Sequence, residues 1–298
     1  MLELVGLTRR FGELVALDDV SFDVPDGAIV GFVGPNGAGK TTTMRIALGV
    51  LEPDAGEVRW QGRDVDAAMR RRFGYMPEER GLYPKMRVLE QLVYLARLHG
   101  LGAADARRRA AETVELMGVQ VRAKDRLEKL SLGNQQRVQL AAALVHEPDV
   151  LILDEPFSGL DPVGVDALSA ILREQADRRG VPVVFSSHQL ELVERLCDSV
   201  VLIDHGSIVA QGSIETLRAS RSRRLIRIEI DGAAHDWWDV VPGVALVEPL
   251  PREGGVFELA EDADDQRLLD VARRAGQVRL FTPVRSTLAE LFREVVRA

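Results

Sequence analysis

One stretch of the sequence has residue types and spacing suited to binding phosphate groups. It reads Gly-Pro-Asn-Gly-Ala-Gly-Lys-Thr and occupies positions 34 to 41. Glycine permits positive φ angles and close backbone approach, so successive N–H groups can point into one concavity. The pattern G-x-x-x-x-G-K-[ST] predicts that Lys40 contacts the β- and γ-phosphates of a triphosphate and that the Thr41 hydroxyl ligates Mg²⁺. The nucleotide-binding residues that we expect are Gly34, Pro35, Asn36, Gly37, Ala38, Gly39, Lys40, Thr41 and Thr42.

The residues on either side of this loop favour a binding site over a chance match. Residues 28–33 form a short apolar run typical of a buried strand, and residues 42–48 can form a helix. The positive end of such a helix adds to the attraction for an anion. The alternative is a glycine-rich turn with a solvated lysine, which explains neither flank.

A second apolar run, at residues 150–153, ends in Asp154 and Glu155. A buried strand that delivers carboxylates at its C-terminal edge is where a P-loop fold holds Mg²⁺, so we expect both acids beside the phosphate loop. The alternative is an ordinary turn at a strand end. His188 follows a third strand-like run and would lie past a sheet edge shared with Glu155. A lone histidine is usually a satisfied polar residue, but this position favours a functional one.

Several further residues have both a structural and a functional interpretation. Ser131 can serve as the N-cap of a helix that runs to residue 145, and Gly133 near its positive end could help to bind an anion. Asp161, followed by Pro162, is suited to cap the next helix, and capping alone could explain it. Phe11 lies upstream of the loop between two predicted strands, where it could stack on adenine or pack into the core.

Strands and helices alternate along the chain in the manner of an α/β fold. Residues 2–24 and 58–62 have the pattern of half-buried strands, so the phosphate loop is embedded in an antiparallel β subdomain. Apolar residues at helical spacing between positions 88 and 118 predict a helical insertion, which we extend to about residues 79–148. A closing hairpin is expected at residues 200–210.

A change in composition near residues 213–224 predicts a domain boundary. We therefore expect an α/β domain at residues 1–215 and a small α+β accessory domain at residues 216–298. Strands of the second domain are expected at residues 225–230, 244–247, 256–259 and 277–281, with helices near residues 268–272 and 288–296. Trp237 and Trp238 are expected to pack in its interior rather than to recognise a ligand.

Composition and charge exclude several classes of protein. The chain has 298 residues, a net charge of −8 and no long basic stripe, so nucleic acid is not an expected partner. The single cysteine, Cys197, excludes an internal disulfide and a cysteine metal cluster. We find no signal-peptide pattern, and no apolar run is long enough to span a bilayer. A local basic cluster could be a solvated linker or could contact lipid headgroups. It consists of Arg218, Arg221, Arg223, Arg224 and Arg227.

Taken together, residues 1 to about 215 resemble the ATP-binding-cassette (ABC) ATPases, and every motif follows the family's order. The phosphate loop is similar to Walker A, and residues 150–155 are similar to Walker B with its adjoining glutamate. Residues 130–137 resemble the LSGGQ signature and residues 158–161 the D-loop. His188 matches the switch histidine and Phe11 the aromatic A-loop.

Residues 73–90 and the additional C-terminal domain resemble the ATP-binding subunits of ABC-2-type exporters, the group that includes drug and sodium extruders. The sequence departs from the family pattern at two places. Leu132 and Asn134 replace the usual glycine and glutamine of the signature, while Ser131 and Gly133 are retained. The Q-loop position holds Glu78, whose carboxylate can approach Mg²⁺ or its waters but cannot donate a hydrogen bond as an amide can.

The resemblance implies an Mg²⁺-dependent ATPase that works as a head-to-tail homodimer. Walker A of one copy and the signature of the other, with Ser131, Gly133 and Asn134, would sandwich each ATP. The D-loop Asp161 belongs to the same set of motifs. Thr41, Asp154 and Glu78 would hold Mg²⁺. Glu155 would polarise the attacking water, His188 would contact the γ-phosphate and Lys40 would bind the phosphates.

The partners implied are a second copy of the chain and polytopic membrane permease subunits, which would place the protein on the cytoplasmic face of a cell membrane. One alternative is a soluble ABC ATPase of DNA maintenance or translation, although the long coiled-coil insertions, zinc cysteines or tandem cassettes of such proteins are not found. A GTPase would need N-K-x-D, which is also missing, and a kinase would need an acceptor site and a lid. A pure binding module would not need Glu155 beside Asp154.

Overall fold

The computed structural model describes residues 1–79, 81–221, 224–251, 253–260, 262–284 and 288. The chain forms two compact units, one of residues 1–214 and one of residues 215–294. Helix α8 (Ile214–Arg221) spans this division, within the segment whose composition predicts a boundary. No helix among the described residues is long and apolar enough to cross a bilayer.

A four-stranded antiparallel sheet flanks the phosphate loop in the first unit. Its order is β2-β1-β4-β5. The strands are β1 (Leu2–Phe11), β2 (Leu14–Val24), β4 (Ala55–Trp60) and β5 (Arg63–Asp64). Strand β1 pairs with β2, which precedes the loop, and with β4, which follows it. The predicted antiparallel subdomain around the loop is therefore confirmed.

A six-stranded sheet with the order β10-β9-β3-β8-β7-β6 forms the second layer of this unit. The strands are β3 (Ile29–Val33), β6 (Phe73–Met76), β7 (Val150–Asp154), β8 (Val183–Ser187), β9 (Ser199–Asp204) and β10 (Ser207–Ser213). All neighbours pair in parallel except β10, which forms the expected hairpin with β9. Because the carboxyl ends of parallel strands meet at one edge, the phosphate loop after β3 and the acids after β7 come together there.

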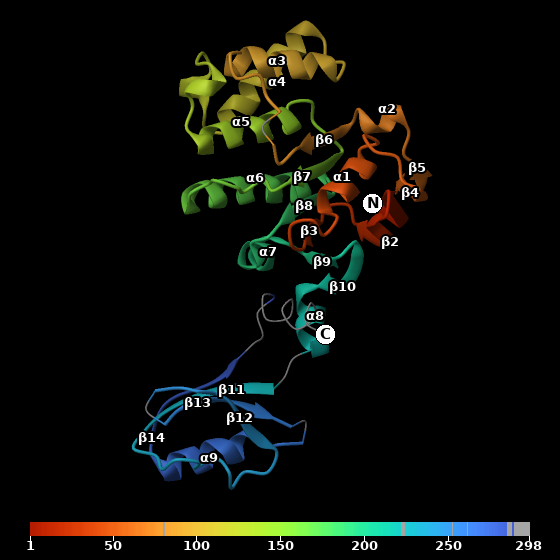
Figure 1. The fold of residues 1–298 in the computed structure, drawn as a ribbon. Helices are drawn as coiled ribbons and strands as arrows, with labels where there is room; N and C mark the ends of the chain where they lie inside the picture. The colour runs from red at the N-terminus through yellow and green to blue at the C-terminus, as the bar shows by residue number, and fades with distance from the viewer. Residues whose placement is uncertain (80, 222–223, 252, 261, 285–287, 289–298) are drawn as a thin grey trace. The chain divides into compact units, whose positions relative to one another are not determined.

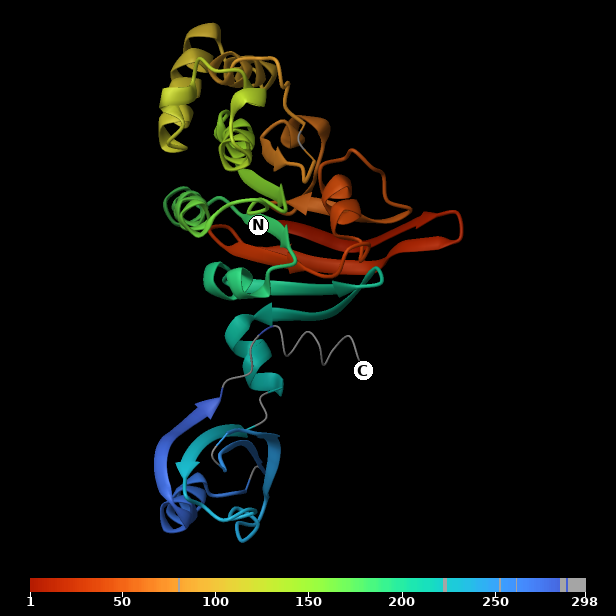
Figure 2. The ribbon, with the colours of Figure 1, turned by 60° about the vertical axis from the view of Figure 1, so that its left-hand side comes forward.

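Helices of the first unit cover the parallel sheet and form the insertion. Helix α1 starts within the phosphate loop, and α3, α4 and α5 lie together as a group apart from the antiparallel sheet (Figures 1 and 2). The helices are α1 (Lys40–Ala47), α2 (Ala67–Arg70), α3 (Val88–Leu98), α4 (Ala103–Leu116), α5 (Leu132–Leu144), α6 (Pro162–Arg179) and α7 (Leu190–Leu196), with short turns η1 (Gln120–Arg122) and η2 (Leu127–Lys129). Helices α2 and α7 were not predicted from the sequence.

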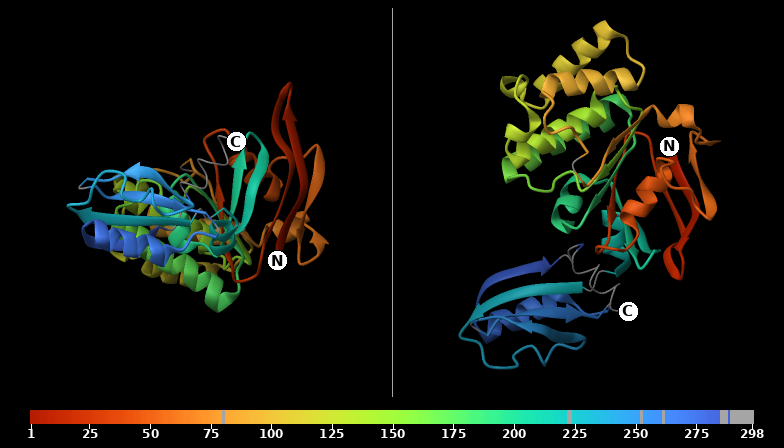
Figure 3. Two further views of the ribbon diagram at one scale, coloured as in Figure 1. Left: turned by 90° about the horizontal axis from the view of Figure 1, so that it is seen from below. Right: turned by 45° about the horizontal axis from the view of Figure 1, so that its top comes forward.

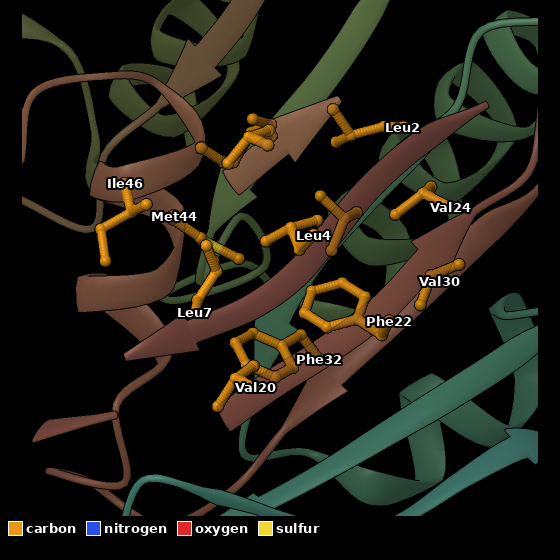
Figure 4. Close-up of a cluster of buried hydrophobic side chains, with 14 of the residues drawn as sticks. Leu2, Leu4, Leu7, Val20, Phe22, Val24, Val30, Phe32, Met44 and Ile46 are labelled. Atoms are coloured by element: carbon orange, nitrogen blue, oxygen red, sulfur yellow. The ribbon is translucent and has the colours of Figure 1, made fainter. Parts of the chain in front are cut away.

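The main hydrophobic core of the first unit lies between its two sheets (Figure 4). Phe22 of β2 stacks on Phe32 of β3 with a ring-centroid distance of 5.0 Å. Met44 and Ile46 of α1 pack against the same cluster. This packing fixes the strand before the phosphate loop and the helix after it, and so fixes the loop itself.

The second unit contains an antiparallel sheet with the order β12-β13-β11-β14. Its elements are β11 (Arg224–Asp231), β12 (Val244–Pro249), β13 (Gly255–Leu259), α9 (Asp265–Ala275) and β14 (Gln277–Val284). Helix α9 lies along one face of this sheet (Figures 1 and 3). Trp237 and Trp238 are buried against Phe257, which confirms their predicted packing role. The predicted terminal helix near residues 288–296 lies outside the described residues apart from Leu288, as do Arg223 and the side chains of Arg218 and Arg221.

Candidate nucleotide-binding site

The phosphate loop has the backbone geometry that its glycines predict. Gly37 and Gly39 have φ angles of 83° and 110°, in the region that glycine adopts most readily. Gly34 is required by close packing instead, because a Cβ at this position would lie 2.2 Å from the carbonyl oxygen of Ile203. The sequence indicates that such loops need glycine, but it does not distinguish these two reasons.

Lys40 is buried beneath the loop. Its Nζ donates hydrogen bonds to the carbonyl oxygens of Gly34 at 2.7 Å and Pro35 at 3.1 Å, and the residue is only 7% exposed. Both of these acceptors are uncharged, so the loop concentrates positive charge where a phosphate would bind. The N-terminal end of α1 adds to this field.

A cleft of about 380 Å³ opens over the loop. Apolar residues, residues of the phosphate loop and acidic residues all line it. The lining residues are Phe11, Leu14, Val15, Ala16, Asn36, Gly37, Gly39, Lys40, Thr41, Thr42, Glu78, Asp154, Glu155 and His205. A cleft that combines apolar side chains with a phosphate cradle has the chemistry needed to hold a base and a polyphosphate at once.

Asp154, at the end of β7, is hydrogen-bonded through both carboxylate oxygens. Thr41 Oγ1 donates to Oδ2 at 2.9 Å, and Ser186 Oγ donates to Oδ1 at 2.5 Å. The residue is 1% exposed. The hydroxyl of the phosphate loop and the carboxylate of β7 thus meet at one point, as the sequence predicts.

Glu155 follows in a conformation that is uncommon for a residue with a side chain. Its φ angle is 50°, and it is 7% exposed. Its carboxylate Oε1 lies 2.9 Å from Nδ1 of His188. Because an ionised carboxylate only accepts hydrogen bonds, Nδ1 carries the hydrogen when Glu155 is charged. His188 and Glu155 thus lie at one sheet edge, as expected, and the structure adds a direct hydrogen bond between them.

Burial raises the pKa of Glu155, while the hydrogen bond and charge of His188 and the charge of Lys40 oppose this shift. The net direction of the pKa shift is upward, so the carboxylate is a stronger base than an exposed glutamate.

Glu78 lines the cleft on a segment that is held by helix α5. Gln139 Nε2 donates to the carbonyl oxygens of Pro77 at 2.6 Å and Glu79 at 3.2 Å. One turn earlier on the same helix, Gln136 Nε2 donates to the carbonyl oxygens of Glu155 and Pro156. Helix α5 therefore holds the backbone around Glu78 and at Glu155, two of the acidic residues that line the cleft.

Eight predicted site residues do not line the cleft: Gly34, Pro35, Ala38, Ser131, Gly133, Asn134, Asp161 and His188. Ser131 occupies the N-cap position of α5, as predicted, but its side chain makes no capping hydrogen bond, and it is exposed. Asp161 caps α6 by accepting a hydrogen bond from the backbone N–H of Gly164 at 2.7 Å. The capping interpretation is thus confirmed for Asp161.

Other predicted residues take supporting positions or resolve an open choice. Gly34 and Pro35 supply carbonyls to Lys40, and the N–H of Ala38 donates to Pro35 O, so these residues shape the loop without lining the cleft. Phe11 is 47% exposed at the cleft, which rules out the core-packing alternative.

Sequence reasoning missed Ser186, His205 and the apolar residues 14–16. Strand β2 begins at Leu14, and pairing with β1 brings its start to the cleft. His205 has a φ angle of 45° in the β9–β10 turn, where the neighbouring Gly206 is hydrogen-bonded to Ala38 of the phosphate loop and to Asp18 of β2. A serine in an apolar strand carries no distinctive signal.

Comparisons with known proteins agree with this geometry. A family model described as ABC transporter matches residues 17–158, and one described as the C-terminal domain of DrrA1-3-like ATP-binding proteins matches residues 212–296. An uncharacterised ABC transporter ATP-binding protein of Bacillus subtilis, YhaQ, is 36% identical over 307 residues, which cover 100% of this chain and 99% of the relative. The chain belongs to the ABC transporter ATP-binding proteins.

Other relatives and solved structures are consistent with this assignment. The daunorubicin/doxorubicin resistance ATP-binding protein DrrA of Streptomyces peucetius is 33% identical, over 98% of this chain and 91% of its own. A solved structure of an ATP-binding subunit of an ABC transporter superposes with a TM-score of 0.68 at 34% identity, over 74% of this chain and 92% of that one. The predicted α/β ABC ATPase fold is confirmed. ATP hydrolysis is characteristic of this family, and nothing in the comparisons supports the alternative role in DNA maintenance or translation.

Proposed function

We propose that this ABC ATP-binding protein hydrolyses ATP to power an ABC-2-type exporter, as one half of a head-to-tail homodimer. The observation that carries the proposal is the convergence of Lys40, Thr41, Asp154 and Glu155 on a single cleft over the phosphate loop. The second unit, residues 216–298 by our expectation, would be an accessory domain.

The cleft has the complementary parts that ATP requires. Residues 34–42 would hold the phosphates through backbone N–H groups and the buried ammonium of Lys40. Phe11, which is exposed at the cleft, would stack on the base. This arrangement supports the predicted role of residues 34–42 in binding the phosphates and that of Phe11 in stacking on the base.

The oxygen donors beside the phosphate loop fit Mg²⁺. The Thr41 hydroxyl and the Asp154 carboxylate are 2.9 Å apart and are hard ligands, and Glu78 lines the same cleft. Mg²⁺ usually takes one or two protein ligands and completes its shell with waters and substrate phosphates. When bound, it would neutralise phosphate charge. The protein's part is to hold Thr41 and Asp154 in a fixed orientation.

Glu155 and His188 would act on the attacking water. The carboxylate of Glu155, whose pKa is raised by burial, is suited to polarise a water molecule. The hydrogen bond from His188 to Oε1 of Glu155 would hold that carboxylate in its orientation. His188 Nε2 remains free of this contact and would face the γ-phosphate. Lys40 would stabilise the charge that develops on the phosphate.

Completion of the site by a second copy would explain the residues outside the cleft. Ser131, Gly133 and Asn134 lie at the N-terminal end of α5, where a helix favours an anion, and Ser131 is exposed with no capping hydrogen bond from its side chain. In a head-to-tail dimer they would contact the nucleotide bound to the partner, with Asp161 near the same interface. Neither anion site is complete alone, so a shared ATP would hold two copies together.

Export is supported by the relatives and by the second unit. DrrA is a drug-resistance ATP-binding protein, and a Nod factor export ATP-binding protein of Paraburkholderia xenovorans is 37% identical over 74% of this chain and 73% of its own. We propose that the present protein works with a polytopic permease and is peripheral on the cytoplasmic face of the membrane. Closure and opening of the dimer would act on the permease through the surface near Glu78 and the helical insertion.

A Glu155→Gln variant tests the core of this proposal. It should bind ATP like the wild type, lose nearly all phosphate release, and shift from monomer to dimer with ATP and Mg²⁺ in analytical ultracentrifugation. Glu174→Gln, on the exposed part of α6, is the matched control and should retain hydrolysis. A variant that binds ATP but remains monomeric would refute the sandwich dimer. Co-purification of the tagged protein with a polytopic membrane protein tests the exporter assignment separately.

A further inference from the structure

Ser186 connects the two acids of the candidate site. It lies in β8 and is 0% exposed. Its hydroxyl donates to Asp154 Oδ1 at 2.5 Å and accepts from the backbone N–H of Glu155 at 2.9 Å. Strand β8 pairs in parallel with β7, and Ser186 lies opposite Asp154 in this pairing. One side chain therefore contacts both consecutive acids from the neighbouring strand.

The first contact fixes the orientation of Asp154. The Ser186 hydroxyl donates a hydrogen bond to Oδ1 of the Asp154 carboxylate, and the Thr41 hydroxyl donates one to Oδ2. A carboxylate held at one oxygen cannot rotate freely, so Oδ2 stays turned toward the hydroxyl of the phosphate loop. Partners of this kind orient a ligating carboxylate without touching the metal.

The second contact holds the backbone where the strand ends. Glu155 leaves the ladder with a φ angle of 50°, a conformation that a residue with a side chain seldom adopts. Such conformations persist where surrounding contacts enforce them. At this turn the backbone N–H of Glu155 donates a hydrogen bond to the Ser186 hydroxyl. The carbonyl oxygen of Glu155 accepts a hydrogen bond from Gln136 Nε2.

We infer that Ser186 is a positioning residue for the reaction, which aims Asp154 at the metal position and Glu155 at the attacking water. This inference rests on the proposed function, since it requires that Thr41 and Asp154 hold Mg²⁺. Ser186 itself would touch neither metal nor nucleotide.

The adjacent serine provides a matched control. Ser187 is also buried, at 2% exposed, but among the described residues its hydroxyl accepts a hydrogen bond only from the backbone N–H of Gln189, at 3.0 Å. Removing either hydroxyl takes one oxygen atom from the same buried strand. Ser187→Ala therefore controls for the loss of a buried hydroxyl from this strand, without loss of the contacts to Asp154 and Glu155.

The experiment measures binding of a fluorescent ATP analogue to the full chain while Mg²⁺ is titrated, together with steady-state hydrolysis. Ser186→Ala should raise the Mg²⁺ concentration needed for half-maximal enhancement of binding by about 10- to 100-fold, as loss of such a partner typically does. It should lower kcat more than it raises KM. Analogue binding without Mg²⁺ should be unchanged. Ser187→Ala should match the wild type in the Mg²⁺ titration.

Two further variants keep the result decisive. Ser186→Cys preserves the shape and supplies a weaker donor and acceptor, so its Mg²⁺ midpoint should lie between wild type and Ser186→Ala, and it serves alone if the alanine variant fails to fold. Asp154→Asn should abolish the Mg²⁺ enhancement. If it does so while both Ser186 variants behave like Ser187→Ala, the inference about Ser186 is overturned. If Asp154→Asn retains the enhancement, the proposed metal site is wrong instead.

Discussion

Glu155 is unfavourably placed in two respects. Its carboxylate is buried, which raises its pKa, and its backbone lies in the left-handed region. The compensating contacts come from His188 to the side chain and from Ser186 and Gln136 to the backbone. Unfavourable local states of this kind are common where a group must be kept ready for chemistry.

Replacing Glu155 by glutamine should therefore stabilise the nucleotide-free protein at pH 7. Because the folded pKa is raised, the folded state binds more protons than the unfolded state, and the stability present below the unfolded pKa is lost as pH rises through the folded pKa. Glutamine does not ionise, so the variant does not lose this part of the folding stability as pH rises. Its advantage should appear in urea unfolding at pH 7 and vanish below the ordinary pKa of glutamate. Lower stability than wild type at pH 7 would contradict this account.

His146 presents a second titration that is coupled to folding. Burial, the neighbouring His99 and Arg179 lower its pKa to about 4, against a smaller upward effect of its bond to the carbonyl of Phe73. The rings of His99 and His146 stack at 3.6 Å, and His99 Nδ1 bonds the carbonyl of Arg71 at 2.8 Å. The pair thus ties the ends of α3 and α5 to the chain that enters β6.

Acidification should weaken the protein through His146. Between pH 6.5 and 4, His146 is protonated in the unfolded chain but stays neutral in the folded protein. The free energy of unfolding therefore falls by up to about 3 kcal/mol as pH decreases across this window. His146→Gln keeps a donor for the Phe73 carbonyl and removes the titration. The free energy of unfolding, measured in urea from pH 7 to 4, should fall less steeply in the variant; equal slopes would exclude His146 as a source.

Helix α5 links the proposed trans-acting residues to the cleft of its own subunit. Ser131 stands at its N-terminal end, while Gln136 and Gln139 hold the backbone at Glu155 and around Glu78. A displacement of this helix would therefore reach both acidic segments through direct hydrogen bonds. This gives a physical route by which contact at the signature could affect the cleft.

The start of α6 allows capping by Asp161 to be separated from any role at a dimer interface. Asp161→Ala removes the hydrogen bond to Gly164 and should cost about 1 kcal/mol of stability, whereas Asp161→Asn preserves an N-cap acceptor and should cost little. Thermal unfolding of the monomer measures this difference. If hydrolysis falls equally in both variants while stability falls only in the first, the carboxylate acts beyond capping; if hydrolysis follows stability, capping is sufficient.

The sequence predicts those parts of the site that depend on neighbouring residues along the chain. The apolar runs before Gly34 and Asp154 are short and bounded by turn residues, so both strand ends could be predicted, and with them their meeting at one sheet edge. Ser186 and Gln139 act through contacts with distant backbone, at Glu155 and at Pro77 and Glu79, and their residue types fit ordinary strand and helix positions. Helix α8 was not predicted, because the change in composition at residues 213–224 indicates a domain boundary and does not by itself indicate a helix.

At the scale of the whole molecule, the two units have separate hydrophobic cores. Phe257 is fully buried in the second unit, against Trp237 and Trp238 at ring-centroid distances of 5.3 and 5.2 Å. Phe32 is fully buried in the first and lies directly before the phosphate loop. Because the proposed catalytic residues all lie in the first unit, damage to the second core should leave the cleft intact.

Phe257→Ala should destabilise the second unit by about 3–5 kcal/mol and leave ATP hydrolysis near the wild-type rate. Two of the three tryptophans, Trp237 and Trp238, belong to that core, so tryptophan fluorescence should report its unfolding at a lower urea concentration than the loss of hydrolysis. Phe32→Ala is the reciprocal variant, in which hydrolysis should fail first while most of the fluorescence transition is retained. If both signals shift together in either variant, the two units unfold as one cooperative body, and the second unit supports the first instead of folding on its own core.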